Sequence, residues 1–91
     1  MDVKANRFVV LGYFHSLLED KKVLIVSLPD DSEALLPFSI TKNFIDNLKL
    51  LSPGDLVGIT GCFVKSNGKF CKLHAEKVTF MQGINAGKGV E

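Results

Sequence analysis

The sequence contains no tryptophan, only two cysteines and almost no net charge, at +1 over 91 residues. Because 11 basic side chains are balanced by 10 acidic ones, the chain is neither a polybasic arm nor an acidic tail, and its overall charge does not indicate a partner. Cys62 and Cys71 lack metal-ligand spacing and have no second pair nearby, so we expect two reduced thiols and no metal site.

Long apolar runs are also missing. No stretch approaches the roughly 18 apolar residues of a membrane helix, and the polar residues 1–7 do not resemble a signal peptide. We therefore expect a cytoplasmic protein. What is present is enough chain for one compact domain, with 46% hydrophobic residues and seven phenylalanines to supply a core.

Five segments predict β-strands, because they are rich in β-branched and aromatic residues and end at turn signals. These segments span residues 7–18, 23–28, 35–40, 55–64 and 70–81. Gly12 in the first segment predicts a bulge or bend. Pro37 in the third predicts a strand that lies partly at a sheet edge, since proline has no N–H to donate.

Residues 41–51 follow a different period. Phe44, Leu48 and Leu51 recur at i, i+4 and i+7, which predicts an amphipathic helix. Thr41 is the expected N-cap, and the Ser-Pro-Gly sequence that follows the segment ends the helix.

Three strands, one helix and two strands is the order of the Greek-key oligonucleotide/oligosaccharide-binding (OB) barrel, in which the helix covers one open end. We therefore expect an all-β fold with a small α insertion: a five-stranded OB barrel with one helix between the third and fourth strands. The domain should span residues 1–81, and the Gly-rich residues 82–91 should form a flexible tail.

The hydrophobic pattern also predicts the register of the last hairpin. A three-residue loop over 66–68 sets Phe63 opposite Cys71 on an inner face and turns Lys72 and His74 outward. A two-residue loop would mix apolar and charged residues on one face, because a slip of one residue exchanges the two faces. The phenylalanines expected in the core are Phe8, Phe14, Phe38, Phe44, Phe63 and Phe80.

The first strand is apolar on both of its sides. Phe8, Val10, Gly12 and Phe14 alternate with Val9, Leu11 and Tyr13. A half-solvated antiparallel strand should have one polar side, so the second side needs a cover. We predict a homodimer whose interface includes Val9, Leu11 and Tyr13.

Two stretches resemble bacterial single-stranded-DNA-binding proteins. Residues 6–14 (NRFVVLGYF) are similar to the opening strand of that family, and residues 44–80, with LSPGDLVGITG and the closing EKVTF, are similar to its helix and last hairpin. The chain lacks the family's base-stacking tryptophans and its acidic, Phe-tipped tail, and in this it looks more like the shorter primosomal replication proteins of replication restart. The resemblance implies an OB barrel that binds single-stranded DNA as a homo-oligomer.

The OB barrel binds ligands on its second and third strands, between the loops that join strands one to two and four to five. Both loops carry lysines here. Lysines and an exposed aromatic ring together suit single-strand binding, so the candidate nucleic-acid-binding residues are Lys21, Lys22, Lys65, Lys69, Phe70, Lys72 and His74. Lysines at hairpin tips are also common solubilising residues, and the acidic residues 30–33 argue against a continuous cationic groove.

Catalysis has little support. We find no Ser/His/Asp or Cys/His arrangement in a convincing context and no Gly-rich phosphate loop between a strand and a helix. We expect no enzyme activity, no cofactor and no small-molecule substrate. The first hypothesis is a single-stranded nucleic-acid-binding protein, with DNA favoured over RNA by the resemblance alone. The alternative is an OB-fold protein-interaction subunit of a replication or other nucleoprotein complex that does not itself bind nucleic acid.

Overall fold

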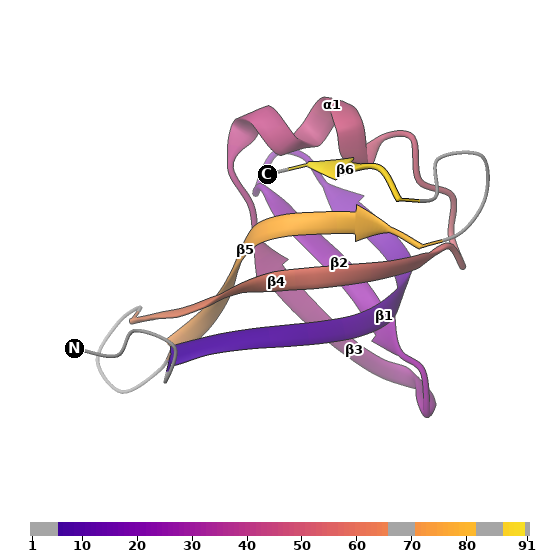
Figure 1. Cartoon of the computed structure of the whole chain (residues 1–91), viewed down its shortest axis with the longest axis horizontal. Helices are drawn as coiled ribbons and strands as arrows, with labels where there is room; N and C mark the ends of the chain where they lie inside the picture. The colour runs from indigo at the N-terminus through magenta and orange to yellow at the C-terminus, as the bar shows by residue number, and fades with distance from the viewer. Residues whose placement is uncertain (1–5, 66–70, 82–86, 91) are drawn as a thin grey trace.

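The computed structural model describes residues 6–65, 71–81 and 87–90. The elements are β1 (Arg7–Leu18), β2 (Val23–Leu28), β3 (Asp31–Ser39), the 3-10 helix η2 (Lys42–Phe44), α1 (Ile45–Leu48), β4 (Leu56–Lys65), β5 (Cys71–Phe80) and β6 (Gly89–Val90). The strands form one sheet that curves round on itself, with α1 lying across one end (Figure 1).

The sheet closes into a barrel. Its strand order is β3-β2-β1-β4-β5-β6, and a parallel contact of Ser39 with His74 joins β3, at one end of this row, to β5, so that strands β1 to β5 form a closed ring. β1 is long enough to pair with β2 through its second half and with β4 through its first half. This arrangement confirms the expected five-stranded Greek-key OB barrel with a helix between strands three and four. The prediction for Pro37 also holds, because β3 pairs with β5 only at Ser39.

The barrel interior is filled by alternate residues of each strand. Leu24 and Val26 on β2, and Val57 and Ile59 on β4, are fully buried, as the two-residue period of a strand requires. The remaining buried hydrophobic residues are Phe14, Phe38, Ile40, Phe44, Leu48, Ala75, Val78, Phe80 and Val90. The helical segment contributes Phe44 and Leu48, so it closes one end of the core.

The helix is shorter than predicted. Instead of one helix over 41–51, a 3-10 turn leads into four α-helical residues, and Thr41 makes no side-chain cap bond to the backbone. The Thr41 hydroxyl bonds the Asn43 side chain instead. After α1, the N–H groups of Leu50 and Leu51 bond carbonyls only three residues back, so the chain tightens and leaves the helix. The apolar spacing identified the buried face but not the helix length.

The last hairpin differs from the predicted register by two residues. Phe63 pairs with Leu73 rather than Cys71, and Lys65 pairs with Cys71, while the predicted loop 66–68 lies outside the described residues. A shift of two keeps every side chain on its predicted face. A bulge between Thr60 and Gly61 then moves the register once more, so the predicted pairing of Thr60 with His74 is wrong and Thr60 pairs with Lys77.

Two other backbone features are placed differently from the prediction. The bulge of β1 lies between Phe14 and Ser16 rather than at Gly12. Gly12 instead allows close approach, because a Cβ there would lie 2.9 Å from the Ser27 carbonyl oxygen. β3 also begins at Asp31, four residues earlier than predicted, so Glu33 belongs to the strand rather than to a loop.

The end of the chain also differs from the flexible tail expected over 82–91. Gly89 and Val90 form β6 against β5, and the Val90 side chain is buried. Backbone bonds from Phe80 N–H to the Lys88 carbonyl (2.7 Å) and from Gly87 N–H to the Phe80 carbonyl (2.7 Å) hold this segment. The apolar Val90 lies beside Val78, its pairing partner on β5. Residues 82–86 and 91 lie outside the described part of the chain.

Candidate nucleic-acid interface

The closure between β3 and β5 brings the two lysine-bearing corners to one wall of the barrel. Val23 on β2 pairs with Ser39 on β3, and Ser39 pairs with His74 on β5. Two strand spacings of about 4.8 Å therefore separate Val23 from His74. The Lys22 carbonyl accepts the Ile40 N–H at 3.0 Å, which fixes the β1–β2 turn at the end of this row.

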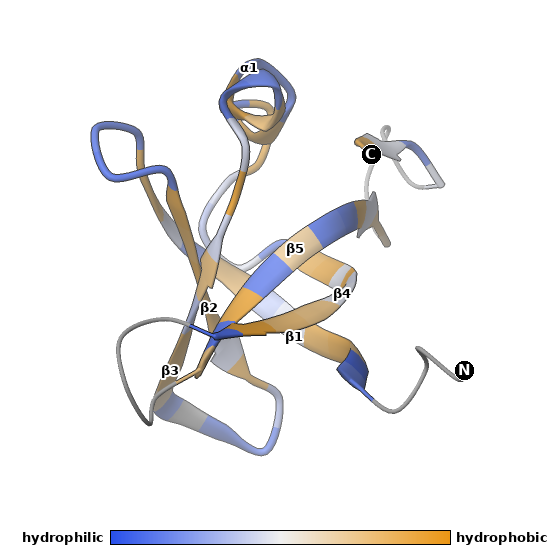
Figure 2. Ribbon diagram, turned by 90° about the vertical axis from the view of Figure 1, so that its left-hand side faces the viewer, coloured by the Kyte–Doolittle hydropathy of each residue, from blue (hydrophilic) through white to orange (hydrophobic). Residues whose placement is uncertain are grey.

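Four of the predicted lysines surround this wall and are exposed. Lys21 and Lys22 lie in the β1–β2 turn, Lys65 is the last residue of β4, and Lys72 lies at the start of β5. None of the four forms an ion pair with another described residue. In Figure 2 the β1–β2 turn, the end of β4 and the start of β5 are seen on the same side of the barrel as β2 and β3. We name Lys21, Lys22, Lys65, Lys72 and the strands between them the lysine wall.

His74 has a structural contact that the sequence did not reveal. Its Nδ1 lies 2.8 Å from the Ser39 hydroxyl oxygen, and the Ser39 hydroxyl also lies 3.4 Å from the Leu73 carbonyl. His74 is half-buried, so its ring reinforces the single pairing that closes the barrel. Its predicted outward direction is compatible with a nucleic-acid contact, because Lys72 lies two residues away on the same face of β5.

The remaining predicted site residues, Lys69 and Phe70, lie outside the described residues. The acidic Asp30, Asp31 and Glu33 lie at the far end of β2 and β3. Five residue steps of about 3.3 Å, on the order of 16 Å, separate that end from the Lys21–Lys22 turn. The wall is therefore cationic at one end and acidic at the other, and a phosphate path should cross it toward β5 rather than run along β2.

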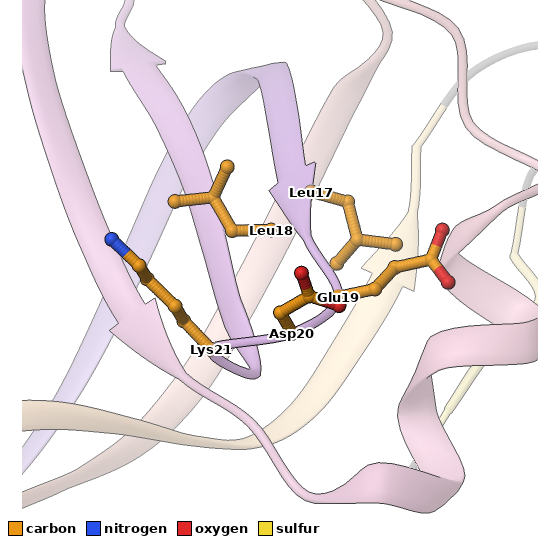
Figure 3. A pocket seen from close by; sticks show the side chains of 5 residues that line it. All are labelled: Leu17, Leu18, Glu19, Asp20 and Lys21. Atoms are coloured by element: carbon orange, nitrogen blue, oxygen red, sulfur yellow. The ribbon is translucent and has the colours of Figure 1, made fainter.

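A hollow of about 520 Å³ lies at the β1–β2 turn, lined by residues Leu17, Leu18, Glu19, Asp20 and Lys21. Figure 3 shows Glu19 and Lys21 extending to opposite sides of this turn. The Glu19 carboxylate lies 3.3 Å from the Lys49 ammonium, just after α1, so the turn is tied to the helix. Lys21 is left free to reach away from the helix.

Arg7 is a cation whose charge is neutralised by an ion pair, so it is not part of the candidate interface. Its guanidinium forms an ion pair with Glu76 of β5, and the other Glu76 oxygen lies 3.8 Å from the Cys62 sulfur. Burial, and then the negative charge of Glu76, raise the pKa of the Cys62 thiol. Cys62 is therefore held as a neutral thiol, whereas Cys71 is exposed at the start of β5.

The outer side of β1 carries the apolar surface predicted for the dimer. Val9 is 82% exposed, Leu11 46% and Tyr13 37%, so no part of the described chain covers them. Their partners on β4 are Thr60, Gly58 and Leu56, respectively. Single exposed apolar residues are ordinary, but three successive outward positions on one strand form a patch of the kind that marks an interaction surface.

Phe63 is an aromatic residue whose predicted core position is wrong. It was expected in the core but is 43% exposed. β1 pairs with β4 only as far as Cys62, so Phe63 and the residues after it pair with β5 alone. The period-two pattern correctly placed Phe63 on the inner face, but the barrel ends one residue before it. Only the length of the β1–β4 pairing would have revealed this.

Neither a metal site nor a membrane-spanning helix is found in the described part of the chain. Residues 6–65, 71–81 and 87–90 contain no group of three or more His, Cys, Asp or Glu side chains arranged to hold a metal ion. The same residues form no helix that is long and apolar enough to cross a membrane.

The comparisons with known proteins define the class of fold. No protein-family model and no curated protein matches the sequence. Solved structures do match, among them OBody NL8 bound to hen egg-white lysozyme, which is 21% identical, with 88% of this chain and 99% of that chain covered at a TM-score of 0.64. OBody AM1L10 bound to hen egg-white lysozyme is also 21% identical, with 85% and 79% covered at a TM-score of 0.60.

The third similar structure is the dimeric N-terminal domain of the PriB protein from Thermoanaerobacter tencongensis. It is 19% identical, with 87% of this chain and 99% of that chain covered at a TM-score of 0.58. At these identities the likeness establishes the OB fold alone. It supports the barrel that the resemblance to single-stranded-DNA-binding proteins implied, whereas membership of that family stays a prediction.

Proposed function

We propose that the protein is a non-catalytic OB-fold module that binds single-stranded nucleic acid, preferably DNA, across the lysine wall. The observation that carries this proposal is the row of paired residues from β2 through Ser39 to His74, which joins the two lysine corners. The four exposed lysines have no described ion-pair partner, so their charges are available to phosphates. The preference for DNA rests on the sequence resemblance.

The binding free energy should come mainly from phosphate neutralisation and counterion release. For single strands the slope of log K against log salt is about −0.7 per neutralised phosphate. Four contacts, one for each exposed lysine of the wall, therefore predict a slope of about −3. Raising the salt concentration from about 50 to 200 mM should weaken binding about 50-fold.

A fluorescence anisotropy titration with labelled oligo-dT tests this proposal. The Lys65→Glu/Lys72→Glu variant should lower the affinity and reduce the magnitude of the salt slope by about 1.4, since two phosphate contacts are lost. Adding Lys69→Glu, to give the triple variant, should abolish binding while the far-UV circular dichroism spectrum stays unchanged. Lys88→Glu is the matched control, because Lys88 is exposed beside β6 and away from the wall. Equal losses in the control and the double variant would contradict the site assignment.

A second candidate is a protein-binding module, and one observation favours it. The outer positions Ile25, Leu35 and Pro37 of β2 and β3 are apolar, and the acidic tip at Asp31 and Glu33 adjoins them. Such a surface offers no aromatic ring to a base. The OBodies show that this fold can bind a protein, lysozyme in their case. Absence of oligonucleotide binding at low salt, together with a protein that stays folded, would favour this candidate over the first.

A homodimer formed through the outer side of β1 is part of the same proposal. The exposed Val9, Leu11 and Tyr13 support it, and the similar PriB domain forms a dimer. Val9 and Leu11 lie beside β4, and Tyr13 pairs with Leu56 of β4 and with Ser27, which is near the acidic end of β2 and away from the Lys21–Lys22 turn. The dimer would therefore leave the lysine wall accessible.

A further inference from the structure

Three phenylalanine rings form a column from the core to the surface at the end of the barrel away from α1. The rings of Phe38 and Phe8 have centroids 5.6 Å apart, and those of Phe8 and Phe63 are 5.5 Å apart with an angle of 61° between their planes. Phe38 is fully buried, Phe8 is half-buried and Phe63 is 43% exposed. These distances are within the range of favourable aromatic pairs, so the exposed ring is supported from below.

A cationic side chain lies close to Phe63 along β4. Lys65 follows two residues later on the same face of β4, about 6.6 Å along the strand, and it is exposed with no described ion-pair partner. The apolar patch of Val9, Leu11 and Tyr13 lies on the opposite, outer side of β1. A ring that served a protein contact would be expected within such a patch, whereas this ring has a free cation beside it.

An exposed aromatic ring next to a lysine is the pairing that sequence-tolerant single-strand binding uses, since a base stacks on the ring while the cation neutralises a phosphate. We propose that Phe63 stacks on a base of the bound single strand and that Lys65 neutralises an adjacent phosphate. This inference rests on the proposed function, and it extends the binding path from the lysine wall round the end of β4. Because Phe63 packs against Phe8, its ring is held in position before the nucleic acid binds. This lowers the entropic cost of ordering the ring on binding.

Replacing Phe63 by leucine tests the stacking, because leucine keeps an apolar side chain but has no flat ring. Base stacking on an aromatic ring is worth enough to change affinity roughly 5- to 140-fold when it is lost. Phe63→Leu should weaken oligo-dT binding by a factor in that range and leave the salt slope unchanged, since no phosphate contact is removed. Phe63→Tyr should restore most of the affinity. Thermal unfolding of each variant separates lost affinity from lost stability.

Phe63→Trp supplies a second readout, because the chain contains no other tryptophan. Stacking against thymine should quench the fluorescence of this single tryptophan as oligo-dT is added. Leu50→Trp is the matched control, since Leu50 is 59% exposed just after α1, at the other end of the barrel, and should not be quenched.

The outcomes separate the two proposals. If the unmodified protein fails to bind oligo-dT at low salt, the proposed function fails and the stacking role fails with it. If the protein binds but Phe63→Leu keeps its affinity within about twofold, the stacking role alone is overturned. An unquenched Phe63→Trp variant also overturns it, because a loss of affinity in Phe63→Leu would then reflect packing rather than stacking.

Discussion

Gly61 should be indispensable for the geometry of the lysine wall, because the backbone of β5 lies too close to Gly61 to leave room for a side chain. A Cβ added at Gly61 would lie 1.9 Å from the His74 carbonyl oxygen and 2.7 Å from the tip of the Phe8 ring. The oxygen belongs to the backbone, so it cannot rotate away and the strand itself must move by about 1 Å. His74 is the residue that closes the barrel through Ser39. Gly61→Ala should therefore disturb both the fold and the wall.

Overpacking a well-packed site costs about 1–3 kcal/mol, and the rigid contact at Gly61 predicts the upper end of that range. Native domains are stable by only about 5–15 kcal/mol. A loss of about 3 kcal/mol should lower the melting temperature by about 12–24 °C, because each kcal/mol shifts it by about 4–8 °C in a domain of this size. Thermal unfolding followed by circular dichroism measures the change.

Gly58 supplies the matched control three residues earlier on the same strand. A Cβ there would meet only the Met81 sulfur, at the ordinary distance of 3.6 Å. Gly58→Ala should leave the melting temperature unchanged or raise it by a few degrees, since alanine reduces the freedom of the unfolded chain by about 0.4–1 kcal/mol. If Gly61→Ala and Gly58→Ala melted at the same temperature, the close approach of β5 to Gly61 would be refuted.

Two further predictions concern the cysteines and the dimer. In the folded protein at pH 8, iodoacetamide should label the exposed Cys71 faster than Cys62, because burial raises the pKa of the Cys62 thiol and keeps it protonated where an ordinary thiol begins to ionise. Peptide mass spectrometry reads the two rates, which should converge in denaturant; equal rates in the folded state would contradict the environment assigned to Cys62. Light scattering should give twice the 10.0 kDa chain mass for the unmodified protein. Val9→Lys/Leu11→Lys should halve that mass by placing charges on the outer side of β1, whereas Leu50→Lys should not, and a monomeric unmodified protein at high concentration would remove the predicted interface.

The candidate site was predictable wherever it depended on position along the chain. Lys21 and Lys22 lie in the predicted turn, and Lys72 and His74 have the predicted outward direction, because strand alternation depends only on parity. The exposure of Phe63 was not predictable, because it depends on how far β1 pairs with β4. The bond from His74 to Ser39 joins residues 35 positions apart, and no local pattern reports a contact of that separation.

The sequence alone determined the order of three strands, a helical segment and two strands, and the inner and outer faces of each strand as far as its bulge, since these follow from hydrophobic period and turn residues within short windows. The tertiary structure decided the registers, the bulges near Phe14 and Gly61, the docking of Val90 on β5 and the short helix. Each of these reflects how closely two distant segments can pack, which is a property of the pair. The joining of two separate lysine turns into one wall is of this second kind, because it required β3 to meet β5.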